Sequence, residues 1–256
     1  MSNETRPAAS PADSSAEARA LFAIIDERIA ARDRDGAITA ALDAVRAERI
    51  GIADLYTQVL SPLMLAIGER WQAGETRVWE EHYTTQIVRG IVDALAPDVI
   101  AAQRKATAAA RAGSAPAGAA APDRVLMACP PGEQHDLGMR MLADRFRLAG
   151  WEVFYLGTDT PVDEIVDAAK RLETDLVVLS ASTHFNRVLL RDAASRIRTA
   201  LTHTRLAVGG PAFALDRQWP TAELLDPVAL GLPGASPPAG LGAPTAADTT
   251  DAKASD

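Results

Sequence analysis

The sequence predicts an N-terminal four-helix bundle followed by a parallel α/β domain. Helical periodicity without strand signals runs from about residue 16 to residue 105. Short apolar, β-branched runs then alternate with amphipathic stretches from about residue 124 to residue 230. Strands that alternate with helices are typical of a parallel, doubly wound sheet. We therefore expect an all-helical part and an α/β part joined by a linker.

The helical part divides into segments whose lengths and short connections fit a bundle. These segments span residues 16–34, 36–46, 52–73 and 78–105. The third segment has one apolar stripe, with a large side chain at every fourth position: Leu55, Val59, Leu63, Ile67 and Trp71. We assign residues 16–106 to the bundle and expect the polar and small residues 1–15 to be disordered.

The α/β part is predicted from four apolar runs, each suited to a buried strand. These runs are residues 124–129, 151–156, 176–179 and 206–208. The intervening helices are expected at residues 137–149, from Pro161 with Thr160 as N-cap and Asp163 at the third position, and at residues 188–201. A weak run at residues 228–230 suggests a short edge strand.

Composition sets the remaining boundaries. Residues 107–123 are rich in Ala, Gly and Pro and are expected to form a linker, and the α/β domain takes residues 124–230. Residues 231–256 have the composition of a disordered tail. With 256 residues and 48% hydrophobic content, the chain is long enough to bury two cores.

Charge and cysteine usage limit the partners. A net charge of −8 argues against nucleic acid as a direct partner. One cysteine, no long apolar run and no signal-peptide pattern predict a cytoplasmic protein without disulfides or a membrane span.

The most informative motif is a histidine turn between the first predicted strand and its helix. It reads Glu133-Gln134-His135-Asp136-Leu137-Gly138. Open parallel sheets bind ligands beyond the carboxyl ends of their strands. A neutral imidazole there, oriented by a nearby carboxylate, is the arrangement expected of a metal ligand with its supporting partner. The Gly-x-Gly-x-x-Gly signature is absent after this strand, so dinucleotide binding is a poor alternative.

The spacing of two further motifs resembles the cobalamin-binding fingerprint. From Gly138, 41 residues precede the triplet Ser180-Ala181-Ser182, and 26 more separate that triplet from Gly209-Gly210. The resemblance implies that His135 is the lower axial ligand of cobalt, in place of the dimethylbenzimidazole base. It also implies that Ser180 and Ser182 contact the displaced nucleotide tail. Glycines at 209 and 210 leave room for that tail.

One residue departs from the usual fingerprint. Glu133 stands where many relatives have Asp. The charge and the hydrogen-bond acceptor are kept, so we expect Glu133 still to orient His135, with a longer arm.

A second motif lies in the bundle, where Trp71 is followed by nine residues and then Glu81-His82. It resembles the light-sensing domain of cobalamin-dependent photoreceptors of the CarH and LitR type, and the resemblance covers about residues 16–215. It implies a bundle over the upper corrin face and a Rossmann-like, flavodoxin-like α/β domain below. Trp71, Glu81 and His82 would surround an adenosyl group, and His184 is expected near the corrin edge. Gln72 stands where these regulators can place a second histidine, so a bis-histidine photoproduct by that route is not expected.

The resemblance leaves several functions open. The MerR-like DNA-binding region of these regulators has no counterpart before the first predicted helix, so we expect a non-enzymatic sensor that binds adenosylcobalamin. Such a sensor would signal through an unidentified protein partner or through a change of homo-oligomer. One alternative is a dual photoreceptor that also binds a bilin such as biliverdin. Another is the corrinoid methyl carrier of a methyltransferase system, although a capped upper face favours adenosyl over methyl.

Overall fold

The computed structural model describes residues 11–112, 123–213, 219 and 222–234. Its helical part consists of α1 (Pro11–Ala30), α2 (Arg34–Arg46), α3 (Ile52–Asp54), the π-helical turn η1 (Leu55–Leu60), α4 (Ser61–Gln72) and α5 (Val78–Ala112). In this part α3, η1 and α4 follow one another without a break, as the single predicted segment 52–73 requires. The helical bundle is therefore confirmed.

The ends of the bundle differ from expectation. Helix α1 begins at Pro11, within the segment for which disorder is predicted, and α5 continues to Ala112, into the predicted linker. Alanine and arginine are strong helix formers, and they fill the last turns of α5. Residues 1–10 and 113–122, the rest of those two segments, lie outside the described residues.

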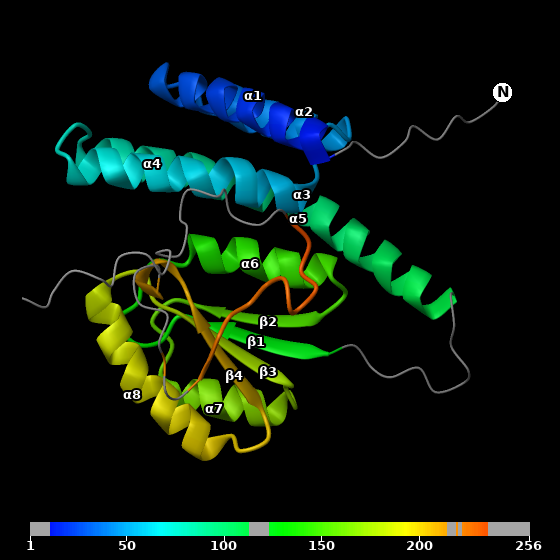
Figure 1. The fold of residues 1–256 in the computed structure, drawn as a ribbon, viewed down its shortest axis with the longest axis vertical. Coiled ribbons are helices and arrows are strands. Elements are labelled where there is room, and N and C mark those ends of the chain that lie inside the picture. The colour runs from blue at the N-terminus through cyan, green and yellow to red at the C-terminus, as the bar shows by residue number, and fades with distance from the viewer. Residues whose placement is uncertain (1–10, 113–122, 214–218, 220–221, 235–256) are drawn as a thin grey trace, which may run out of the picture.

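The α/β part is a parallel sheet with strand order β2-β1-β3-β4-β5 (Figure 1). Its elements are β1 (Arg124–Ala128), α6 (Leu137–Leu148), β2 (Glu152–Gly157), α7 (Val162–Arg171), β3 (Leu176–Ser180), α8 (His184–Ala200), β4 (Arg205–Gly209), η2 (Pro211–Phe213) and β5 (Glu223–Leu224). Helix α6 covers one face of the sheet, whereas α7 and α8 cover the other. This is the flavodoxin-like order, as predicted.

Three local predictions need correction. The run Val228–Leu230 is not a strand: Asp226 accepts hydrogen bonds from the amides of Val228 and Ala229 and so forms a turn, and the edge strand is Glu223–Leu224. Helix α7 begins at Val162 with Pro161, and not Thr160, at the N-cap position; the Thr160 hydroxyl donates instead to the Thr158 carbonyl at 3.4 Å. Helix α8 begins at His184, four residues before its predicted start, because the Thr183 side chain caps it.

Helix α6 belongs to two of the three hydrophobic cores formed by the described residues. Its Leu137 and Met141 side chains pack into the core of the bundle. On the opposite face, Met139, Ala143 and Phe146 pack into a core on the sheet. Figure 1 shows α6 as the layer between the bundle above and the strands below. The bundle and the α/β domain are therefore packed on a common helix.

A buried polar contact reinforces this packing. The hydroxyl of Tyr56, in the π-helical turn, donates to Asp144 of α6 at 3.0 Å, and Arg147 donates to the same carboxylate at 2.8 Å. Burial raises the pKa of the Asp144 carboxyl, and these hydrogen bonds only partly offset the rise. No helix in the described part of the chain is long and apolar enough to cross a membrane.

Replacing Met141 by Ala should destabilise the whole molecule, because its side chain is only 5% exposed and lies in the core that α6 shares with the bundle. We expect a loss of about 2–5 kcal/mol in the free energy of unfolding, measured by urea denaturation. Val228→Ala, at a position 73% exposed, is the control and should change stability by less than about 0.5 kcal/mol. Unfolding of the α/β domain with the bundle left at wild-type stability would contradict a shared core.

Candidate functional site

A cavity of about 570 Å³ lies between the bundle and the carboxyl ends of the strands. The bundle contributes lining residues from η1, α4 and α5, among them Tyr56, Leu65 and Glu81. The α/β domain contributes the His135 turn, the start of α6 and the ends of β3 and β4. Most of the residues singled out in the sequence therefore meet at one cavity, although they come from both parts of the chain.

His135 lies on this cavity, and Glu133 lies buried behind it. The Nδ1 atom of His135 is 2.7 Å from a carboxylate oxygen of Glu133, and the His135 amide donates to the same oxygen at 2.8 Å. An ionised carboxylate only accepts hydrogen bonds, so Nδ1 holds the proton and the lone pair of the neutral ring is on Nε2. This pair has the chemistry of a metal-ligating histidine and its supporting carboxylate.

Glu133 is held in place by two further donors. The Ser182 amide and the Asn186 side chain donate to its second carboxylate oxygen at 2.6 and 2.9 Å. Burial alone would raise the pKa of the Glu133 carboxyl, but these hydrogen bonds and those from His135 hold it below its usual value. Asn186 is not anticipated in the sequence, because the buried face of its helix also carries Arg187 and so does not single it out.

The serine triplet and the glycine pair lie side by side, because Ser180 and Gly209 are paired in register on β3 and β4. Ser180, Ser182, Gly209 and Gly210 all line the cavity. Gly210 has a positive φ of 104°, and a Cβ there would lie 2.4 Å from the Ala181 carbonyl oxygen. Only glycine fits that position, because a side chain would collide with the Ala181 backbone and the Ser180 hydroxyl.

Gly138 provides open space at the start of α6. It lines the cavity, and a Cβ placed on it would meet no atom within 4 Å. An incoming group can therefore approach the helix backbone beside His135. The lining therefore fits a cofactor with one open metal position and a long polar tail. The residues that would meet it are His135, Ser180 and Ser182 with their hydroxyls, and the glycines Gly138, Gly209 and Gly210.

The bundle residues of the second motif are only partly brought to the cavity. Glu81 lines it and accepts hydrogen bonds from Thr85 at 2.8 Å and from Nδ1 of His82 at 2.5 Å. The His82 side chain is 71% exposed, and Trp71, at the end of α4, is 48% exposed. Among the described residues, neither Trp71 nor His82 belongs to the cavity lining.

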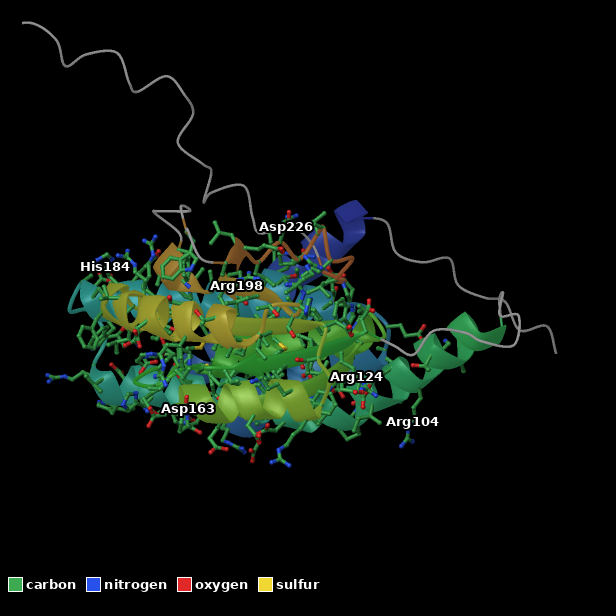
Figure 2. All side chains as sticks on the ribbon, turned by 90° about the horizontal axis from the view of Figure 1, so that it is seen from below. Arg104, Arg124, Asp163, His184, Arg198 and Asp226 are labelled. Carbon is green, nitrogen blue, oxygen red and sulfur yellow. The ribbon has the colours of Figure 1, made fainter. Side chains whose placement is uncertain are left out.

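His184 also lies outside the lining of the cavity as described. It is the first residue of α8 and is exposed at the surface, where Figure 2 labels it at the end of that helix. Trp79, which lies within the motif between Trp71 and Glu81, packs elsewhere: the Arg32 guanidinium lies 5.3 Å from the centre of its ring.

Asp136 and Arg89 are two site residues that the sequence reasoning misses. Arg89 of α5 donates to the Asp136 carboxylate at 2.6 Å, and the Tyr155 hydroxyl of β2 donates to it at 2.8 Å. Both Arg89 and Asp136 line the cavity. Burial would raise the pKa of Asp136, but Arg89 and Tyr155 hold it below its usual value.

Two family models match the chain, and both are described as a B12 binding domain. One covers residues 123–231, which include the α/β domain, and the other covers residues 22–96 of the bundle. These matches support a cobalamin cofactor.

Two curated proteins of Myxococcus xanthus are similar to this chain. The HTH-type transcriptional repressor CarH is 30% identical over 159 residues, which are 61% of this chain and 47% of the repressor. The HTH-type transcriptional repressor CarA is 31% identical over 125 residues, 47% of this chain and 34% of that protein. The chain thus spans about half the length of one relative and a third of the other.

The fold is similar to that of the monomethylamine corrinoid protein of Methanosarcina barkeri. The TM-score is 0.62 at 18% identity, and the match covers 76% of this chain and 85% of that chain. This likeness shows the fold: a helical cap on a corrinoid-binding, Rossmann-like domain. The two domain matches and the similarity to the two repressors support a cobalamin-binding protein.

Proposed function

We propose that this protein is a cobalamin-dependent light sensor that signals through altered contacts with a protein partner or with other copies of itself. The observation that carries the proposal is the cavity, which is lined from below by His135 and from the bundle by Glu81. A flat cofactor between these two layers would contact both, so a change in the cofactor would alter how the layers fit.

On the lower side, His135 is the proposed axial ligand to cobalt. Glu133 would fix the tautomer and orientation of the imidazole through the 2.7 Å contact to Nδ1. Ser180 and Ser182 would donate hydrogen bonds to the nucleotide tail. The tail would pass Gly138 and the pair Gly209-Gly210, where side chains are absent.

On the upper side, Trp71, Glu81 and His82 are proposed to surround an adenosyl group. Adenosylcobalamin, when bound, would supply a light-sensitive cobalt–carbon bond. Trp71 is half exposed in the structure, which leaves its indole face available to a bulky upper ligand. His184 is proposed to approach the edge of the corrin ring from the N-terminus of α8.

The signal would be a shift between two arrangements of bundle and α/β domain. A ligand shifts such an equilibrium only through different interactions with the two states. Residues of α4 and α5 would contact the upper ligand in darkness and lose that contact after illumination. The net charge of −8 supports a protein partner, or a second copy of the chain, over direct contact with DNA.

A corrinoid methyl carrier is the second candidate, and the fold shared with the monomethylamine corrinoid protein favours it. A dual sensor that also binds biliverdin is the third. Cys129 offers little support for a covalently attached bilin, because its thiol is buried and burial raises its pKa to about 12.

Replacing His135 by Ala should abolish histidine ligation of cobalt while leaving the fold intact, because the His135 side chain is 66% exposed. The measurement is the electron paramagnetic resonance of cob(II)alamin bound to protein labelled with ¹⁵N-histidine, in which a coordinated histidine nitrogen splits the cobalt lines differently from the ¹⁴N of the cofactor's own base. Retention of that nitrogen splitting in the variant would contradict the assignment of His135.

Trp71→Ala should weaken binding of adenosylcobalamin by about 1–3 kcal/mol, the usual value for stacking of a base on an aromatic ring. Binding of methylcobalamin should stay at the wild-type level, because methyl does not reach the indole. Dissociation constants for both cofactors provide the measurement, with Trp79→Ala as the matched control, since that ring packs on Arg32. Equal losses of affinity for both cofactors would contradict the proposed contact between Trp71 and the upper ligand.

Light should change the oligomeric state of the protein loaded with adenosylcobalamin. Size-exclusion chromatography in darkness and after illumination measures this, with the His135→Ala variant as control. An unchanged elution profile, combined with methyl transfer from bound methylcobalamin to an added acceptor system, would favour the methyl-carrier function instead.

A further inference from the structure

Two ion pairs of opposite polarity join α5 to α6. Arg89 of α5 contacts Asp136, the residue that precedes α6, and Asp93 of α5 contacts Arg140 one turn further along α6. On α5 the base precedes the acid by four residues, whereas at the start of α6 the acid precedes the base by four residues. Further along, the Gln103 side chain donates to the Trp151 carbonyl at 2.9 Å. The two helices therefore run side by side in the same direction with a fixed register.

Asp136 is more than a surface partner of Arg89. It occupies the N-cap position of α6, yet its side chain makes no capping hydrogen bond to the helix. Its carboxylate turns to Arg89 and Tyr155 instead, and the residue is only 9% exposed. Loss of Arg89 would leave a nearly buried carboxylate with a single neutral donor, which is a costly arrangement.

The two carboxylates on either side of His135 are thus fixed to different parts of the molecule. Glu133 is held by the end of β3 and by α8, through the Ser182 amide and the Asn186 side chain. Asp136 is held by the bundle, through Arg89, as well as by Tyr155 of β2. The position of the imidazole is therefore set jointly by the α/β domain and by the bundle.

We propose that Arg89 is a positioning residue for His135, acting through Asp136 rather than by contact with the metal. The inference rests on the proposed binding of cobalamin by His135 and names the bundle residue that controls it. The strength of cobalt ligation by His135 should therefore depend on a side chain of the bundle. Loss of that side chain should weaken the ligation about 10- to 100-fold, as the loss of a partner that orients a metal ligand does.

The test compares Arg89→Gln with Arg140→Gln, which removes the neighbouring ion pair between the same two helices. Hydrogen exchange of the cofactor-free proteins should show faster exchange at residues 134–138 in Arg89→Gln only. With cob(II)alamin bound, the concentration of ¹⁵N-labelled imidazole that displaces His135, read from the change in nitrogen splitting that the isotope causes, should fall about 10- to 100-fold in Arg89→Gln. Arg140→Gln should stay within about twofold of wild type, and Arg89→Lys should recover part of the loss, since it keeps the charge.

Wild-type exchange and wild-type imidazole competition in Arg89→Gln would overturn the proposal. Equal changes in Arg89→Gln and Arg140→Gln would also overturn it, because the effect would then be general docking of the bundle. If Arg89→Gln does not fold, Arg89→Lys takes its place in both measurements and should show smaller changes in the same direction. A wild-type protein without nitrogen splitting would refute the proposed function, while hydrogen exchange would still decide whether Arg89 fixes the turn.

Discussion

The carboxylate of Glu133 is the interaction on which the site depends. It lies fully buried and accepts four hydrogen bonds: two from His135, one from the Ser182 amide and one from Asn186. Its ionised state survives burial only because these donors are present. The end of β1, the end of β3 and the start of α8 therefore converge on one negative charge. Replacing this residue would disturb all three together.

Helix α6 extends the effect of that charge to the bundle. It begins directly after the His135 turn and inserts Leu137 and Met141 among the bundle side chains. If the bundle only covered the α/β domain, the core of that domain would share no helix with the bundle. Here the bundle core and the core on one face of the sheet both include α6, so a displacement of the turn at its N-terminus reaches both. The cavity lies where these elements meet.

The sequence predicts the parts of the structure that local chemistry determines. The His135 turn follows β1 because motif and strand are contiguous, and apolar runs predict the other main strands. The edge strand is missed because the Asp226 turn occupies the apolar run that suggested it. The pairing of Arg89 with Asp136, 47 residues apart, depends on packing between two parts of the chain, which no local pattern records. Its only trace is charge at matched intervals on α5 and α6.

The reversed charges on α5 and α6 also restrict how the two parts of the molecule can move. A slide of α5 by one turn along α6 would bring Arg89 opposite Arg140, or Asp93 opposite Asp136, so each attraction would become a repulsion. Shear along this interface is therefore opposed in both directions. Opening by a hinge breaks the same pairs without bringing like charges together. Relative motion in this molecule should accordingly be separation and reclosure, with the original register restored each time.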